Sequence, residues 1–282
     1  MRHERFDTPG KLRLDLSVSA GEIDVRAEEG VAETTVDLEP LRSNDAGREA
    51  VESARIQLRD RGDAQELVVD VRSTRGLGIF TRGAEVRLVV HCPAGAELEA
   101  EGGSADVQAA GRYSTVSVQT GSGDVKVAEV DGDAKLRSGS GDLSLERVDG
   151  ELTAQTGSGD VEVGRTGRDA TLRSASGDVV VHDATLELAV QTASGDVRVE
   201  AVSVGEVSVQ SASGDVYVGV RKGRTVWMDA KSMSGETTSD LAVGDAPDEQ
   251  DDEEGPLVEL RIQTMSGDIH VARAAERADL PR

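Results

Sequence analysis

The chain has 282 residues and a formal net charge of −23 at pH 7, and only 2% of its residues are aromatic. That charge repels phosphate backbones and argues against nucleic acid as a partner. The shortage of aromatics excludes a large globular core of Phe, Tyr and Trp, whereas a stacked core of Val, Leu and Ala fits the composition. A single cysteine, Cys92, excludes an internal disulfide framework and a cysteine-based zinc site.

Residues 1–100 predict a β-rich N-terminal capping region with long, irregular connections. Alternating apolar and polar residues indicate half-buried strands, and an Asn-Asp pair before an Ala-, Arg- and Glu-rich run indicates a capped helix. The expected elements are strands at 11–25, 33–38, 55–59, 66–72 and 84–91, and a short helix from Asn44 or Asp45 through Ala54.

From residue 101 onward a tetrad Thr/Ser-x-Ser-Gly, followed by an acid, recurs through the chain. The first five intervals between its serines are each 18 residues, and the next three are 19, 21 and 32. A fixed period of this length indicates a repeat architecture. The serines are Ser104, Ser122, Ser140, Ser158, Ser176, Ser194, Ser213, Ser234 and Ser266.

Each repeat contains two short alternating stretches separated by glycine-containing turns, which predicts two strands per coil. The aliphatic residues after each acid, such as Val125 and Val127, recur at the same places and should form inward-facing columns. The predicted fold of residues 101–271 is therefore an all-β, single-stranded parallel β-solenoid, similar to a β-helix or β-roll, with about 18 residues per coil. Stacked coils rise about 4.8 Å each, so the rod should be on the order of 40 Å long.

The pattern loosens toward the C-terminus. Trp227, the only tryptophan, is expected to cap the wider end of the core. Residues 241–256 contain seven acids and predict a disordered loop, because such a block cannot form a core. A last coil is expected at 257–271, followed by a frayed tail at 272–282.

The acid of the repeat forms a column with one member per coil. Like charges about 4.8 Å apart repel by roughly 0.9 kcal/mol per pair even in water, so either cations or backbone N–H donors must offset them. Calcium needs six to eight oxygens, and the motif supplies too few. We therefore favour turn and capping chemistry, and we expect no metal site and no cofactor. The column comprises Asp106, Asp124, Asp142, Asp160, Asp178, Asp196, Asp215, Glu236 and Asp268.

A basic, apolar segment at 72–83 stands out in this acidic chain. One interpretation is a loop folded back over the first coil, with Phe80 closing the core; the other is a contact site for a protein partner. The candidate contact residues are Arg75, Leu77, Ile79, Phe80 and Arg82.

The sequence contains no catalytic constellation, so we predict that the protein is not an enzyme. Its four histidines are scattered, and no phosphate-binding loop, nucleophile elbow or zinc signature is present. We see no signal peptide and no transmembrane segment, and therefore expect a cytoplasmic protein without a membrane span.

Several stretches together resemble a known family. They are Gly-Glu-Ile-Asp-Val25, Pro93-Ala-Gly-Ala96, the Ser-Gly-Asp-Val repeats, Gly219-Val-Arg-Lys-Gly223 with Trp227, and Ser266-Gly-Asp-Ile-His-Val271. This order is similar to that of a bacterial β-strand-repeat family of unknown function, often labelled "putative adhesin", in its unanchored form. The resemblance implies a β-solenoid without defined functional residues.

Two hypotheses about function follow from these observations. The leading one is a structural or interaction scaffold that binds a protein partner or self-associates. The alternative is a ligand-binding module stabilised by calcium or another cation through the Asp column. A polysaccharide-active enzyme is a third, less favoured hypothesis, since a sugar groove would lack the usual aromatic platforms.

Overall fold

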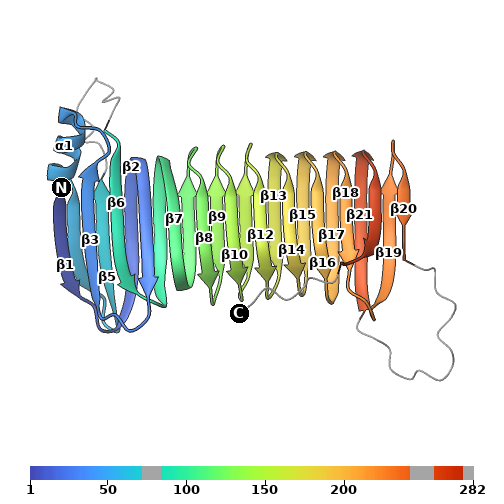
Figure 1. Ribbon diagram of the computed structural model, residues 1–282, viewed down its shortest axis with the longest axis horizontal. Helices are drawn as coiled ribbons and strands as arrows, with labels where there is room; N and C mark the ends of the chain where they lie inside the picture. Colours follow the sequence, from blue (N-terminus) through green and yellow to red (C-terminus); the bar gives the residue numbers. More distant parts are fainter. Residues whose placement is uncertain (72–83, 242–256, 276–282) are drawn as a thin grey trace.

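The computed structural model describes residues 1–71, 84–241 and 257–275, which form a rod of stacked β-strands (Figure 1). The strands belong to one hydrogen-bonded sheet of 22 strands that coils around a narrow core. The N-terminal elements are β1 Arg2–Asp7, β2 Lys11–Glu28, β3 Glu33–Pro40, α1 Asp45–Ser53, β4 Arg55–Asp60, β5 Ala64–Val71, β6 Val86–Pro93 and β7 Ala96–Thr120.

The middle of the rod consists of coils with two strands each. Every strand pairs in parallel with its counterparts one coil before and one coil after; Leu143, for example, lies opposite Val125 and Val161. The two aliphatic columns that follow the acid are at most 3% exposed. The predicted parallel β-solenoid is confirmed. The strands are β8 Val125–Val130, β9 Ala134–Ser138, β10 Leu143–Val148, β11 Leu152–Thr156, β12 Val161–Thr166, β13 Ala170–Ser176, β14 Val179–Ala184, β15 Leu188–Ser194, β16 Val197–Val202, β17 Gly205–Ser213 and β18 Val216–Val220.

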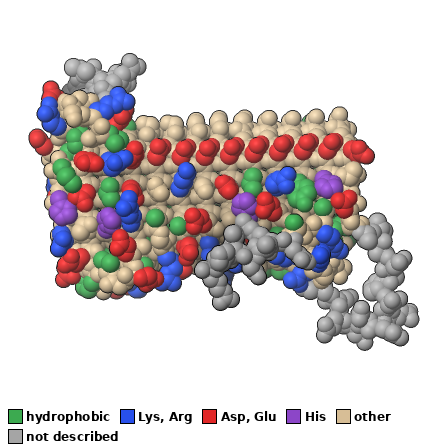
Figure 2. All heavy atoms as spheres, viewed as in Figure 1, with side chains coloured by type: hydrophobic (Ala, Val, Ile, Leu, Met, Phe, Trp, Pro, Cys, Tyr) green, Lys and Arg blue, Asp and Glu red, His purple; other side chains and the backbone are tan. Residues whose placement is uncertain are grey.

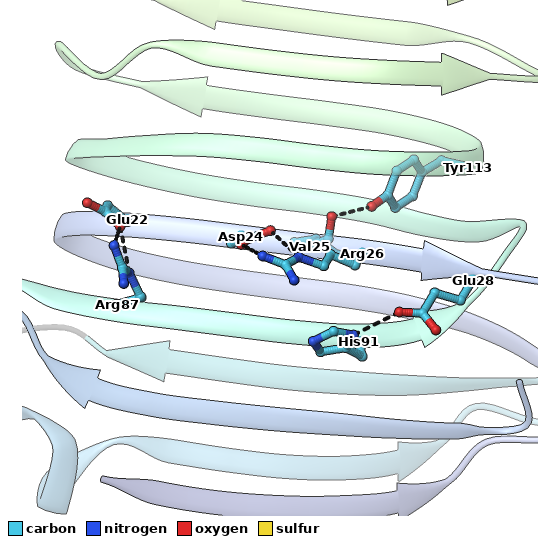
Figure 3. A network of polar contacts seen from close by, with 8 residues as sticks. All are labelled: Glu22, Asp24, Val25, Arg26, Glu28, Arg87, His91 and Tyr113. Carbon is cyan, nitrogen blue, oxygen red and sulfur yellow. Dashed lines mark hydrogen bonds and ion pairs between the residues drawn. The ribbon is translucent and has the colours of Figure 1, made fainter.

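The N-terminal strand β2 lies inside the stack. It pairs in parallel with β7 on one side and with β5 and β6 on the other. β5 and β6, which follow β2 in the sequence, therefore lie between β2 and the N-terminal end of the rod. Side chains tie β2 to both neighbours (Figure 3): the Tyr113 hydroxyl of β7 donates to the Val25 carbonyl at 3.0 Å, and Arg87 of β6 donates to Glu22 at 2.7 Å.

Antiparallel strands close the N-terminal end of the rod. β4 pairs with β5, β3 pairs with β6, and β1 pairs with β3. Helix α1 contacts β3, β5 and β6 and buries Val51. Its N-cap is Asn44, whose side chain accepts a hydrogen bond from the Gly47 N–H at 2.7 Å, as expected from the sequence. We call β1, β3, β4 and α1 the closed end.

At the other end of the rod, the order of the coils in space differs from their order in the chain. β21 pairs with β17 on one side and with β19 on the other (Figure 1), and β22 likewise pairs with β18 and with β20. The four strands are β19 Thr225–Ser232, β20 Thr237–Ser239, β21 Leu257–Ser266 and β22 Ile269–Arg273.

The expectation that 257–271 forms the last coil is therefore wrong, since the outermost coil is β19 with β20. The reason lies in the inward side chains. Those of β21 and β22 are Val, Leu and Ile and are fully buried between two neighbouring coils. Those of β19 are Val226, Met228 and Ala230, and because Ala230 stands opposite Ile262, this coil has less apolar surface to lose by facing solvent.

The remaining expectations for the chain divide into two groups. The predicted helix and the predicted strands of the N-terminal region are confirmed, with ends shifted by a few residues. The predicted acidic loop falls almost entirely on 242–256, outside the described residues, and so does the tail beyond Ala275. Within the described part of the chain, no helix is long and apolar enough to cross a membrane.

Candidate functional site

The partner-contact residues predicted from the sequence cannot be placed in the fold. Arg75, Leu77, Ile79, Phe80 and Arg82 all fall within 72–83, outside the described residues. Their role stays a prediction.

The acid column forms a ladder of carboxylates, which Figure 2 shows as a continuous line along the rod. Each Asp carboxylate of the column accepts a hydrogen bond from the backbone N–H of the acid in the next coil. The Asp142 N–H donates to Asp124 Oδ1 at 2.9 Å, and the Asp160 N–H donates to Asp142 Oδ1 at 2.9 Å. The same contact, at 2.8–3.0 Å, continues to the Glu236 N–H of the outermost coil.

These N–H donors offset the repulsion between neighbouring carboxylates. Among the described residues, no group of three or more His, Cys, Asp or Glu side chains is arranged to hold a metal ion. The hydrogen bonds from the backbone N–H groups support the interpretation of the column as turn and capping chemistry.

In several coils the hydroxyl that opens the tetrad joins its coil to the preceding one from the inside. Ser138 Oγ donates to the Gly123 carbonyl of the preceding coil at 3.1 Å and accepts from the Gly141 N–H at 2.8 Å. Thr156 Oγ1 donates in the same way to the Gly141 carbonyl at 2.9 Å. These hydroxyls are buried, so they stabilise the stack and are not presented to a partner.

The second position of the tetrad lies at the corner of each coil, and its residue type decides whether a side chain is present at that corner. A Cβ on Gly121 or Gly139 would lie 2.4 or 2.3 Å from a carbonyl oxygen of the preceding coil, so only glycine fits there. From Ala175 onward the strand continues into the tetrad, and Ser176 pairs with Ser194. In order along the rod, the position holds Gly103, Gly121, Gly139, Gly157, Ala175, Ala193, Ala212, Met265 and Met233.

The last coil leaves the end of the core uncovered. β19 pairs with β21 and β20 pairs with β22, and no other described strand pairs with either. Val226, Met228 and Ala230 continue the inward positions of β21. Met228 is 38% exposed, whereas Leu260 opposite it is fully buried, because no described coil covers Met228.

Further apolar side chains surround this end. Trp227 is 48% exposed, and the Arg261 guanidinium lies 5.9 Å from the centroid of its ring. Met233 is 80% exposed. The expectation that Trp227 caps the core is wrong, because alternate residues of a strand face opposite sides and Met228 takes the inward position. We call this surface the open end; it comprises Val226, Trp227, Met228, Ala230, Met233, Leu257 and Met265.

One protein family matches nearly the whole length of this solenoid. The family described as Toastrack DUF4097 matches residues 15–272. The chain belongs to this family. The match extends from within β2 to within β22, so both inserted segments are part of the Toastrack region. The family resemblance inferred from the repeats is thereby confirmed. No curated protein was found to match this Toastrack chain.

Solved structures similar to the Toastrack chain share little sequence with it. A "putative adhesin" from Bacteroides fragilis NCTC 9343 is 11% identical, with 96% of each chain covered and a TM-score of 0.46. A "putative lipid binding protein" from Parabacteroides distasonis ATCC 8503 is 12% identical, with 96% of each chain covered and a TM-score of 0.43.

Between its two ends, the Toastrack solenoid carries charge pairs on its outer face. His182 lies between two acids, with Nδ1 2.9 Å from Glu200 and Nε2 3.1 Å from Glu162. The hydrogen bond to Glu200, helped by the contact with Glu162, raises the pKa of His182 against the opposing effect of its partial burial. These side chains pair with one another across neighbouring coils and so stabilise the stack from its outer face.

Reasoning from the sequence missed the open end of the Toastrack chain. A signal was present, however: the second position of the tetrad changes in the sequence from Gly to Ala to Met. This change indicates that the corner accepts a side chain in the C-terminal coils, and that in the last two coils this side chain is apolar.

Proposed function

We propose that this Toastrack protein is a non-enzymatic, adhesin-like interaction scaffold that binds protein through its open end. The observation that carries the proposal is the distribution of exposed apolar side chains. Eight large hydrophobic side chains are exposed among the described residues, and five of them lie at the open end. Apolar side chains gathered on one exposed surface are a feature of interaction sites, and Trp and Met are enriched at interfaces.

The rest of the rod supports this role as a spacer. Its acids and hydroxyls take part in stacking the coils, and its aliphatic columns are buried. Buried hydroxyls and surface carboxylates both link neighbouring coils, so the solenoid holds the open end at a fixed distance from the closed end.

Site-specific photo-crosslinking in cells that express the protein tests the proposal. A photoreactive amino acid replaces Met233, which is 80% exposed at the open end, or Leu186, which is 41% exposed on the side of the rod. We expect crosslinked protein adducts from position 233 and few from position 186. Equal yields from the two positions would refute the open end as the binding surface.

A further inference from the structure

We propose that the partner of the open end is a second copy of this chain, joined tail to tail about a two-fold axis. In this pair, β19 of one copy lies antiparallel to β19 of the other, and the two β20 strands pair in the same way. The inference rests on the proposed function, because it names the partner of the same surface.

The first argument is the state of the strand edges. β19 and β20 are hydrogen-bonded on one side only among the described strands. Their outer edges therefore carry a row of backbone N–H and C=O groups available to another strand. Val226, Met228 and Ala230 occupy the inward positions of this last coil, so a covering strand would bury them further.

The second argument comes from the closed end of the same molecule. There, the two outer edges of the solenoid, β5 and β6, each accept an antiparallel strand, β4 and β3. Antiparallel pairing on both edges is thus compatible with the geometry of this stack. The closed end differs from the open end, because β3, β4 and α1 cover β5 and β6 there and its outer strands, β1 and β4, do not repeat the coil of the solenoid. A pair of open ends closes on itself and stops there.

The size of the open end is compatible with a weak, specific pair. β19 has 8 residues, and a strand of that length spans about 26 Å. Two sheets about 10 Å apart, with their side chains, make an end about 20 Å thick. The contact would bury about 500 Å² per copy, or about 1,000 Å² in total, near the lower limit for a specific interface.

Charge determines the conditions under which the pair forms. Each chain has a formal charge of −23, so two copies repel at low ionic strength. Salt screens this repulsion, with a Debye length of about 10 Å at 0.1 M and about 3 Å at 1 M. Association of two copies should therefore strengthen as salt rises, whereas binding of a basic partner would weaken.

The experiment is light scattering coupled to gel filtration of the full chain at about 0.1 M and about 1 M NaCl. We expect the mass at high salt to approach twice the 29.6 kDa of one chain. Met228→Lys introduces an inward-pointing charge at the edge and should weaken association at least about 100-fold. Leu186→Lys is the matched control, since Leu186 is 41% exposed and Met228 is 38% exposed; it should associate like the wild type.

Two further measurements keep the test independent of a folding defect. Circular dichroism checks that Met228→Lys keeps the β content of the wild type. Small-angle scattering of the wild type should show a maximum dimension close to twice that of the monomer, as expected for an end-to-end pair.

A wild-type chain that stays monomeric at both salt concentrations overturns the inference, and so does a dimer that Met228→Lys leaves intact. If the wild type is monomeric while position 233 still crosslinks to another protein, the second copy is excluded but the scaffold function stands. If neither association nor crosslinking at position 233 occurs, both proposals fail.

Discussion

At the closed end, antiparallel strands and a helix cover the last coil, whereas at the open end the outermost coil has no such cover among the described residues. The two ends nevertheless share one device. At each, a segment from a different part of the chain is inserted one coil inside the end, β2 at one and β21 with β22 at the other. Insertion of a distant segment is therefore common to both ends, whereas a cover of antiparallel strands and a helix over the core is found at the closed end alone among the described residues.

The accessibility of thiols should show the largest difference between the ends. Cys92 in β6 is fully buried, and burial raises its pKa to about 12. At pH 8 we expect a thiol reagent to label native Cys92 at least about 10³-fold more slowly than a cysteine introduced as Met228→Cys in a Cys92→Ser background. Both should react at similar rates in denaturant. Rapid labelling of native Cys92 would mean that the closed end opens readily.

Truncation of core side chains should lower the free energy of unfolding more at the closed end than at the open end. Leu67 in β5 is fully buried next to β4 of the closed end, and Leu67→Ala should lower the free energy of unfolding by about 3 kcal/mol. Met228 is 38% exposed, so Met228→Ala should cost less than about 1 kcal/mol. Urea unfolding at low protein concentration, where the chain is monomeric, measures both. Similar losses for the two variants would show that the open end is packed like the closed end.

Glycine replacement compares the middle of the rod with its last coil. A Cβ on Gly141 would lie 1.9 Å from the Gly123 carbonyl oxygen, and one on Gly235 would lie 2.1 Å from that of Gly267. We expect Gly141→Ala to cost about 1–3 kcal/mol, because coils on both sides prevent relaxation. Gly235→Ala should cost less, since the outermost coil can shift outward. Unfolding midpoints test this, and equal midpoints would contradict a freely moving last coil.

A smaller effect should appear with pH in the middle of the rod. The pKa of His182 is raised in the folded protein, mainly by its hydrogen bond to Glu200. Its contribution to stability is therefore fully present below its unfolded pKa of about 6.5 and is lost as pH rises through the higher folded pKa. The wild type should lose more stability than His182→Gln between about pH 6 and pH 8. Parallel melting profiles for the two proteins would argue against this coupling.

Calcium should have no effect on either end. The acid ladder extends to Glu236 at the open end by the same backbone contacts that join its other members. We expect the thermal midpoint to be the same with calcium and with a chelator. A midpoint that rises in calcium would instead support the cation-stabilised alternative.

Local patterns in the sequence were sufficient to predict the coil. The 18-residue period, the aliphatic columns and the cap at Asn44 depend on neighbouring residues and on identical contacts repeated along the chain. The methionines of the open end were also foreshadowed by the change from Gly to Ala to Met. Trp227 was misassigned because the alternation of β19, which places Met228 inward, was not followed through that strand.

Only the tertiary structure decided the order of the coils at the two ends. Each coil presents nearly the same edges and the same inward columns, so any coil can stack on any other, and local sequence does not say which are neighbours. The choice depends on which segments gain most from burial on both sides. β21 and β22, whose inward Val, Leu and Ile side chains are fully buried, take the inner place, and β19 is left outside, where its side chains form most of the open end.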